Sequence, residues 1–543
     1  MAFSYFTQLF GGGMNQDMAP TMLDLSVQNS QINIVASVQN IIFERGEAVT
    51  RPGATSNPVV WPSGSIIRAV KALPFSARTV SANAIQQRMG FFIRNDGTLW
   101  ALQALESLTA LSTTQITGAG FTQSSDQYCD HGIVNGVVLI AGAFGGLIRW
   151  DPATTVYTLL STAKYQYVCG HLSRAVAAFD VSQTSTGYQS KVAWSAPGDE
   201  TTWTGSTSGA GSTVLSDCED AITGVKVCNG VVAIARAYGF HIAIPTGQFP
   251  AVYDFRKLSS MSVGCMHPAT FLVYKNTMFF MSANGIHTFD FADITDIGEG
   301  VYKEISWFIN NQQMTPRAFM SNSYAQIDFQ PSYNICLESV TPTPQSNITP
   351  HYMYNIRERK WTRHIYNNNI SVPGLTNLVC GFEFIPDSAS SLVNPSPLSL
   401  LTVVNRGANA LSVPFIQTWS GADAIDGTGQ AALETQASIT TGQITLDDSL
   451  HDMQVERIQL FYYTPSPSAF VITANGVLAN NAVTTKPITV ITPAATGWNK
   501  QWVNFRLTCN TFSLTLTWPL NTPGPIRLKQ IVFEYTSVGK VRV

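Results

Sequence analysis

A short phrase that recurs along the chain constrains the fold more than any other feature of the sequence. It combines a tight-turn pair, Asn-Gly or a close variant, with a run of apolar and aromatic residues, and it occurs at 94–100, 134–140, 228–234, 275–280 and 283–289. Asn-Gly and Asp-Gly accept the positive φ of two-residue hairpin turns, while Val, Ile, Phe and Trp suit a pleated, half-buried surface. Each copy therefore predicts an antiparallel β-hairpin.

The spacing of these hairpins indicates a repeating architecture. The copies return about every 40 to 50 residues, or about twice that interval, which is the period of a four-stranded propeller blade. Between about 58 and 420, clusters of Gly, Pro, Ser and Thr separate about six or seven segments of this size, with almost no helical periodicity. We expect an all-β protein with a β-propeller over 58–420.

The pattern changes after about residue 421. Long stretches of strict alternation between apolar and polar residues follow, at 458–463, 502–507, 512–518 and 526–535. Alternation over long strands is typical of antiparallel sheets with one buried and one hydrated face. The sequence therefore predicts a separate β-sandwich over 421–543, appended to the propeller.

Residues 1–57 are expected to form an N-terminal arm and lead-in strands. Aromatic and apolar side chains precede a glycine triplet, Gly11 to Gly13, whose permissive backbone suggests a hinge. An aromatic segment ahead of a hinge is suited to docking on a neighbour, either another subunit or a portal protein; packing on its own subunit is the alternative. The candidate contact residues are Phe3, Tyr5, Phe6, Leu9 and Phe10.

The composition indicates an oligomer. Only 12% of the 543 residues are charged, where about a quarter is usual for a globular protein, while 45% are hydrophobic and 11% aromatic. Interface cores are depleted in charge and enriched in aromatic residues, so we expect much of the surface to face other subunits. The net charge is −3 and no run of Lys or Arg occurs, which argues against electrostatic gripping of nucleic acid.

Neither a membrane segment nor a secretion signal is expected. No stretch of about 18 consecutive apolar residues occurs, and the N-terminus lacks a basic start followed by a long apolar run. These features predict synthesis and folding in a cytoplasm. The eight cysteines are scattered singly, which favours buried free thiols over a zinc site or a disulfide framework.

Candidate groups for chemistry are few. Cys129, Asp130 and His131 place a thiol near an imidazole, but neighbouring residues in a strand point to opposite faces. Carboxylates cluster at 217–220 and 447–452, where a bound cation is one interpretation and a polar turn the other. We find neither a Gly-rich phosphate loop nor a His-Glu-x-x-His motif. The expectation is a protein with no catalytic residue, metal or cofactor, and thus not an enzyme.

Three tryptophans are predicted to be packing elements of the propeller. Trp194 ends a strand and is followed by a Pro-Gly-Asp turn and then by Trp203, while Trp361 follows a charged turn. Large rings in such places commonly fill the space between blades. The passages 191–203 and 353–363, in this order along the chain, resemble the propeller of the tail hub or nozzle proteins of short-tailed bacteriophages, also called packaged-DNA stabilisation proteins.

This resemblance, which extends over about residues 45–543, implies a structural role. Proteins of that family form a ring, implied to be a homohexamer, that lies below the portal or adaptor protein in the virion tail. The ring retains the packaged genome, lets double-stranded DNA pass through its channel during ejection without binding it specifically, and carries tail fibres or a tail needle. The implied location is the virion tail, after assembly in the cytoplasm of the host bacterium.

Two other functions fit a propeller. A carbohydrate-binding or receptor-binding protein of the virion would present exposed aromatic platforms. A propeller glycoside hydrolase would need two or three carboxylates converging on a central pocket, and the chain has only 34 acidic residues. Glycan binding and sensitivity to carboxylate replacement would distinguish these alternatives from a tail ring.

Overall fold

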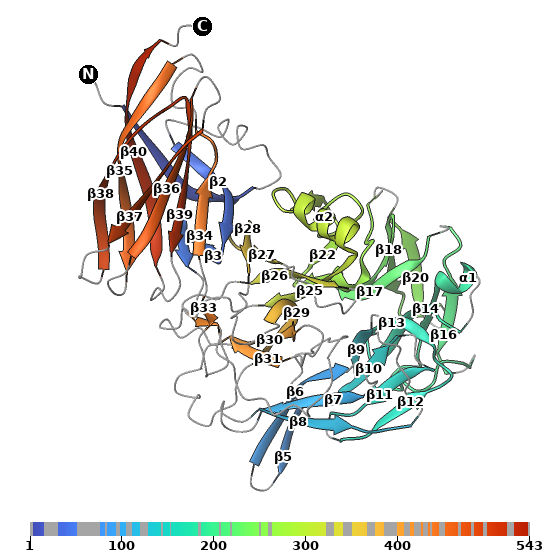
Figure 1. Cartoon of the computed structure of the whole chain (residues 1–543). Helices are drawn as coiled ribbons and strands as arrows, with labels where there is room; N and C mark the ends of the chain where they lie inside the picture. Colours follow the sequence, from blue (N-terminus) through green and yellow to red (C-terminus); the bar gives the residue numbers. More distant parts are fainter. Residues whose placement is uncertain are drawn as a thin grey trace.

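The fold is all-β and has two parts, a seven-bladed propeller and a β-sandwich (Figure 1). It is taken from a computed structural model of the chain. The structure describes residues 4–15, 31–50, 77–81, 84–93, 98–104, 111–119, 129–142, 145–152, 154–182, 186–205, 208–217, 220–248, 251–258, 263–321, 331–339, 350–365, 375–384, 399–406, 413–417, 425–426, 433–434, 437–444, 451–464, 469–478, 483–491, 497–518 and 526–540.

Within the described residues, the propeller has seven consecutive antiparallel sheets, six of four strands and one of three. Their strands are β5 (Ala77–Ser81), β6 (Ala84–Ile93), β7 (Leu99–Ala104), β8 (Leu111–Ile116); β9 (Asp130–Val134), β10 (Val137–Ala141), β11 (Leu147–Trp150), β12 (Tyr157–Leu160); β13 (Tyr165–His171), β14 (Arg174–Asp180), β15 (Lys191–Trp194), β16 (Gly211–Val214); β17 (Ile222–Cys228), β18 (Val231–Arg236), β19 (Phe240–Pro245), β20 (Tyr253–Lys257); β21 (Leu272–Tyr274), β22 (Thr277–Met281), β23 (Ile286–Phe289), β24 (Ile294–Asp296); β25 (Met314–Ser321), β26 (Ser332–Ser339), β27 (His351–Asn355), β28 (Lys360–His364); and β29 (Leu375–Phe384), β30 (Ser399–Arg406), β31 (Val413–Gln417).

The sheets follow one another around the propeller in chain order (Figure 1). The first strands of neighbouring blades contact each other from β9 through β13, β17, β21 and β25 to β29, so these strands form the inner wall. The predicted all-β class and propeller are confirmed, and the seven blades lie within the predicted range of six or seven.

The recurring turns act as the sequence predicts. Asn135 and Gly136 both have positive φ, 49° and 83°, where β9 turns into β10, and Asn229 and Gly230 adopt the same arrangement between β17 and β18. Helices are short: α1 (Thr186–Gln189), α2 (Tyr302–Gln312), which packs beside β25, and the 3-10 turn η2 (Pro268–Thr270). No helix in the described ranges is long and apolar enough to cross a membrane.

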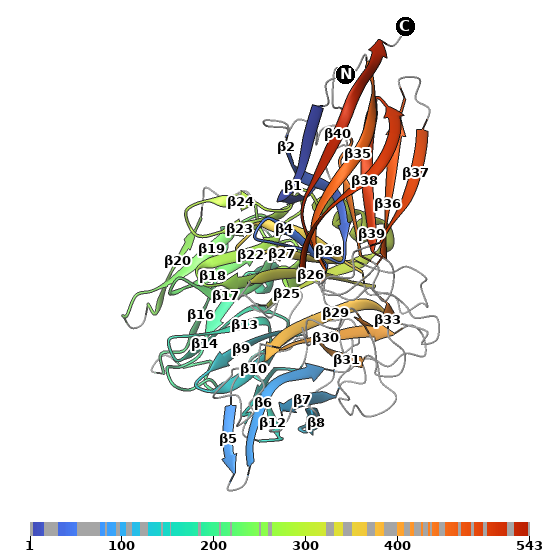
Figure 2. The same ribbon diagram turned by 90° about the vertical axis from the view of Figure 1, so that its left-hand side faces the viewer.

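The sandwich is built from both ends of the chain. Its strands are β1 (Ser4–Met14), β2 (Gln31–Gln39), β3 (Ile41–Glu44), β4 (Glu47–Thr50), β34 (Ala437–Thr441), β35 (His451–Thr464), β36 (Ala469–Val477), β37 (Val483–Ile491), β38 (Gly497–Cys509), β39 (Thr511–Trp518) and β40 (Arg527–Lys540). A small pair, β32 (Ile425–Asp426) and β33 (Leu433–Glu434), precedes β34. The propeller is thus inserted between β4 and β34, and both chain ends lie at the far end of the sandwich (Figure 2).

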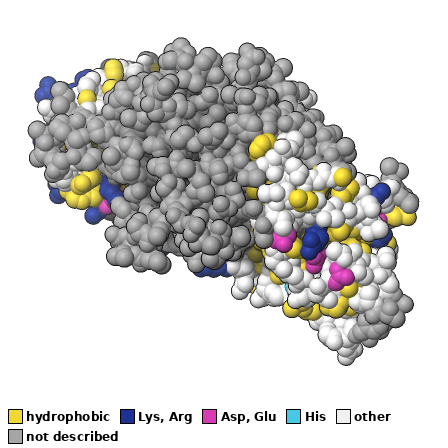
Figure 3. All heavy atoms as spheres, turned by 90° about the horizontal axis from the view of Figure 1, so that it is seen from below, with side chains coloured by type: hydrophobic (Ala, Val, Ile, Leu, Met, Phe, Trp, Pro, Cys, Tyr) yellow, Lys and Arg dark blue, Asp and Glu magenta, His cyan; other side chains and the backbone are white. Residues whose placement is uncertain are grey.

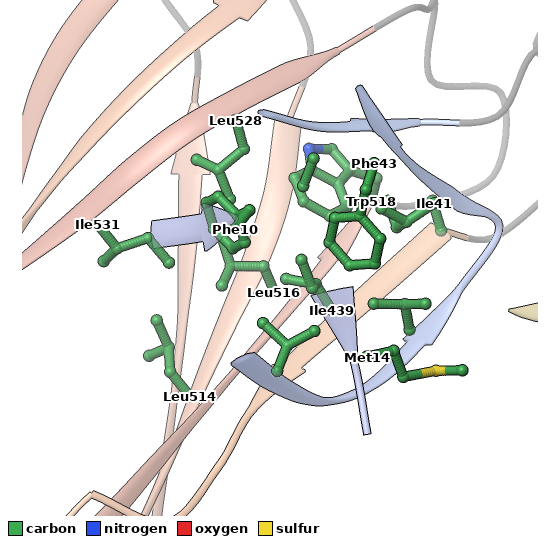
Figure 4. Close-up of a cluster of buried hydrophobic side chains, with 14 of the residues drawn as sticks. Phe10, Met14, Ile41, Phe43, Ile439, Leu514, Leu516, Trp518, Leu528 and Ile531 are labelled. Atoms are coloured by element: carbon green, nitrogen blue, oxygen red, sulfur yellow. The ribbon is translucent and has the colours of Figure 1, made fainter. Parts of the chain in front are cut away.

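The predicted N-terminal arm is therefore wrong as a separate segment. β1 runs parallel to β2 and antiparallel to β40, and the glycine triplet lies within it, beside a register shift between Gln8 and Gly13. Phe10 is fully buried in the sandwich core with Leu516 and Trp518 (Figure 4), so its ring is not available to a neighbour. The triplet is an irregularity in a strand and not a hinge, because ladder pairing holds the residues on both sides of it.

For the other residues of the predicted N-terminal contact, the structure gives less information than for Phe10. Leu9 is half-buried, and Tyr5 and Phe6 lie in β1 opposite Glu534 and Phe533 of β40. Phe3 lies outside the described residues. The sandwich boundary predicted at 421 has to include the N-terminal strands, because one sheet joins β1 to β4 with β34 to β40.

A polar joint fastens the sandwich to the propeller. Asn40, in the turn between β2 and β3, is buried and has φ 55°. Its backbone N–H donates to the Arg363 carbonyl, and its Oδ1 accepts from the Ile365 N–H, each at 3.0 Å. Asparagine is suited to this turn because it tolerates the left-handed region better than most residues.

We expect Asn40→Ala to lower the free energy of unfolding by about 2–3 kcal/mol, since it leaves a backbone N–H unpaired and loses the local fit of asparagine to positive φ. Chemical denaturation measures this effect. Asn40→Gly is the matched control because it accepts the same φ and should cost less than the alanine variant. Equal stability of wild type and Asn40→Ala would show that the joint contributes nothing.

Candidate functional site

The three predicted packing tryptophans lie between blades. Trp194 is 8% exposed and its ring lies 5.6 Å from that of Tyr253 in the next blade. Trp203 is 6% exposed and lies 5.6 Å from the ring of Tyr165. Trp361 is buried in β28 and donates through Nε1 to the Ile297 carbonyl of the preceding blade. Their burial fits a packing role. How much each ring contributes to the free energy of unfolding stays a prediction.

An ion pair crosses the inner wall of the propeller. Asp130 Oδ1 in β9 lies 2.7 Å from Lys226 Nζ in β17, and Asp130 Oδ2 accepts from the Val168 N–H of β13 at 3.3 Å. The Asp130 side chain is 1% exposed and that of Lys226 16%. One carboxylate thereby joins the first strands of three blades. Burial raises the pKa of the nearby Cys169 thiol to about 12, which makes this cysteine a poor nucleophile.

The triplet 129–131 provides no nucleophile and base pair in this geometry. Cys129 is buried, His131 is partly exposed, and Asp130 between them is engaged by Lys226. Among the described first strands, the carboxylates are Asp130 and Glu383. A glycosidase needs two carboxyl groups about 5–10 Å apart that flank the substrate. Of the two, Asp130 already forms an ion pair with the Lys226 ammonium.

Two carboxylates of the acidic cluster at 217–220 pair with two different basic side chains. Asp217 Oδ2 lies 2.9 Å from His241 Nε2, and Asp220 Oδ1 lies 3.3 Å from Nη1 of the buried Arg236. Burial lowers the pKa of His241, although its hydrogen bond to Asp217 opposes the effect. Cys218 and Glu219 lie outside the described residues, and so do Asp447 and Asp448.

A metal site is not found in what the structure describes: no group of three or more His, Cys, Asp or Glu side chains there is placed to hold an ion. His451 and Asp452 are the first residues of β35. At neither carboxylate cluster does the described part of the chain support the alternative interpretation as a cation site.

The most distinctive exposed surface lies on the sandwich, not on the propeller. In β38, even-numbered residues point outward and odd-numbered residues from Val503 to Cys509 are buried. The outward positions include Trp498 and Trp502, which are 45% and 39% exposed. Across the ladder, Tyr463 is paired with Trp498 and Phe461 with Lys500. We call Arg457, Phe461, Tyr463, Trp498, Lys500, Trp502 and Lys529 the aromatic–basic face.

The rings of this face contact each other. The ring centroids of Phe461 and Trp498 are 4.9 Å apart, and Tyr463 meets Trp498 edge-on at 5.9 Å. Such tilted and edge-on pairs stabilise a fixed ring arrangement. The cluster therefore presents a preformed aromatic surface to solvent.

Cations lie over the same rings. Lys500 Nζ and Lys529 Nζ lie 5.4 and 5.7 Å from the Phe461 centroid, and the Arg457 guanidinium lies 4.3 Å above Trp502. Arg457 forms two hydrogen bonds to the buried carboxylate of Glu534, at 2.8 and 3.0 Å. Within the described residues, Lys500 and Lys529 have no carboxylate partner. Among the described residues, the face thus combines exposed rings with two ammonium groups that form no ion pair.

Sequence reasoning missed this face. Its signal in the sequence is the alternation Trp498, Lys500, Trp502, which places large aromatic rings on the solvent side of a strand, where polar residues are usual.

By contrast, the described propeller surface seen from below carries few charged side chains, scattered among uncharged ones (Figure 3).

No protein-family model and no curated protein matches the chain. Solved structures do match. An exo-beta-1,3-galactanase from Phanerochaete chrysosporium is 8% identical, with 87% of this chain and all of that chain covered and a TM-score of 0.24. A glycoside hydrolase family 43 arabinoxylan arabinofuranohydrolase from Bacillus subtilis is also 8% identical, with 88% and 97% covered and a TM-score of 0.22. The active domain of tailspike protein 4 from bacteriophage CBA120 is 9% identical, with 26% and 16% covered and a TM-score of 0.15.

The sequence-based prediction that the chain is not an enzyme is wrong. It rested on the lack of a recognisable catalytic motif, yet glycoside hydrolases are among the solved structures that match most of the chain. Glycosidase carboxylates come from separate parts of the chain, so no local motif has to mark them. At 8% identity and these TM-scores, the similarity assigns neither a reaction nor a substrate to this protein.

Proposed function

We propose that the chain is a structural protein of a bacteriophage tail that forms a homo-oligomeric ring below the portal or adaptor protein. The resemblance of 191–203 and 353–363 to tail hub and nozzle proteins supports this proposal. In this role the ring retains the packaged genome, lets double-stranded DNA pass at ejection and carries tail fibres or a needle. Assembly would take place in the cytoplasm of the host bacterium.

The observation that carries the proposal is the continuous core shared by the two parts. One hydrophobic cluster includes Ile439 and Leu516 in the sandwich, Phe43 in β3, and Tyr352 and Trp361 in the sixth blade. Interfaces between domains of one chain usually permit relative motion. A common core, reinforced by the Asn40 joint, suits a component that has to transmit force without bending.

Formation of the homo-oligomeric ring is tested with the full-length chain. We expect light scattering to give a mass several times the 59.0 kDa of one chain, and negatively stained particles to show closed rings, six-fold if the resemblance holds for subunit number. The low charged fraction of the chain favours such association, because a surface poor in charge exposes more apolar area. Large exposed apolar patches mark contacts between proteins. A protein that remains at 59.0 kDa at every concentration would contradict the ring.

A second function, carbohydrate binding by a virion protein, is favoured by the aromatic–basic face. Exposed Trp498 and Trp502 provide the flat apolar platforms on which sugar rings stack. The second function is compatible with a ring, since the face lies on one layer of the sandwich and not on the propeller.

A further inference from the structure

We propose that the aromatic–basic face binds an acidic polysaccharide, a sugar chain that carries carboxylate groups. The proposal rests on the carbohydrate-binding function above and names the ligand class. It is independent of the ring, because ring formation and glycan binding are measured separately.

The first argument is the spacing of groups along β38. Trp498, Lys500 and Trp502 occupy successive outward positions, and a strand rises about 3.3 Å per residue, so the Cα atom of each tryptophan lies about 7 Å along the strand from that of Lys500. The Cα atoms of the two tryptophans are thus about 13 Å apart along the strand. A polymer with repeated flat faces and repeated negative charges matches this alternation of ring, cation and ring.

The second argument is charge. Lys500 and Lys529 are exposed and lie over the Phe461 ring with no carboxylate partner in the described residues. Both ammonium groups lie within 6 Å of the centroid of this one ring, so an anionic ligand lying over Phe461 is attracted by both of them. A neutral sugar chain would use the rings and leave both charges uncompensated. The face therefore favours an anionic ligand over a neutral one.

The third argument is preorganisation. Glu534 is buried and holds Arg457 by two hydrogen bonds, and Arg457 in turn stacks on one side of Trp502. A ring fixed in this way loses little conformational freedom on binding, which improves affinity. Arg457 and Glu534 are positioning residues in this arrangement, whereas Trp498, Trp502, Lys500 and Lys529 would contact the ligand.

The test is a titration of the full-length chain with polygalacturonate, whose sugars carry carboxylates, and with dextran, which is neutral. We expect binding of polygalacturonate that weakens as salt is added, because exposed charge pairs are screened. Trp498→Ala with Trp502→Ala, and separately Lys500→Gln with Lys529→Gln, should each weaken binding about tenfold or more, the effect of losing about 1.4 kcal/mol of contact energy.

The matched control is Trp307→Ala. Trp307 is 51% exposed on α2, in the other part of the molecule, and its removal should leave binding unchanged. Circular dichroism and the melting temperature check that each variant is folded.

Four results would overturn the proposal. These are absence of binding, equal binding of dextran, binding that survives both pairs of substitutions, and a change in oligomeric mass on substitution without a change in glycan binding. The last would identify the face as a contact between copies of the chain. Rings that form normally without binding polygalacturonate would leave the tail-ring proposal intact and refute this one.

Discussion

Trp203→Ala should lower the free energy of unfolding by about 3–5 kcal/mol, the usual cost of removing a large buried ring. The ring fills the space between the second and third blades, where it joins a cluster that includes Leu139 and Ala177, and its Nε1 donates to the Glu200 carbonyl at 2.9 Å. Truncation opens a cavity there and leaves that carbonyl without its donor. Denaturant titration followed by fluorescence measures the change.

Trp203→Phe and Trp307→Ala are the matched controls for this experiment. Phenylalanine restores most of the buried volume and loses only the hydrogen bond, so it should cost clearly less than alanine. Trp307 is half-exposed, and its truncation should change stability little. If Trp203→Ala kept the wild-type stability and lost only ligand binding, the residue would belong to a binding site and its packing role would be refuted.

Local sequence patterns were sufficient to predict the propeller. A tight turn such as Asn229-Gly230 specifies its own hairpin, because both its backbone conformation and the alternating strands beside it are local properties. The alternation at 502–507 and at 512–518 likewise specified two strands of the sandwich. These features needed no knowledge of distant residues.

Pairing between the ends of the chain could not be predicted in the same way. Thr7 lies opposite Val532, more than 500 positions later, and no local pattern encodes that partner. Gly11 to Gly13 therefore suggested a hinge, although the ladder on both sides makes them part of β1. Phe10 suggested an exposed contact because its burial depends on Leu516 and Trp518 from the opposite end of the chain.

The candidate site was missed for a related reason. Trp498 and Trp502 are visible in the sequence, but their ring partners Phe461 and Tyr463 come from another strand, and Lys529 from a third. Only the register of β35, β38 and β40 brings them to one face. The chemistry of the surface is a property of the sheet and not of any one segment.

The largest effect of a charge change is expected at the inner wall of the propeller. Lys226→Met should destabilise the protein by about 3–5 kcal/mol, because it leaves the buried carboxylate of Asp130 without the ammonium group that balances its charge. Asp130→Asn should cost less, since the amide can still accept from the Val168 N–H and Lys226 keeps some access to solvent. The double variant should be more stable than the sum of the single losses predicts, because neither charge of the pair remains. Urea denaturation of all four proteins gives this cycle, and additive losses would show that the pair does not couple the blades.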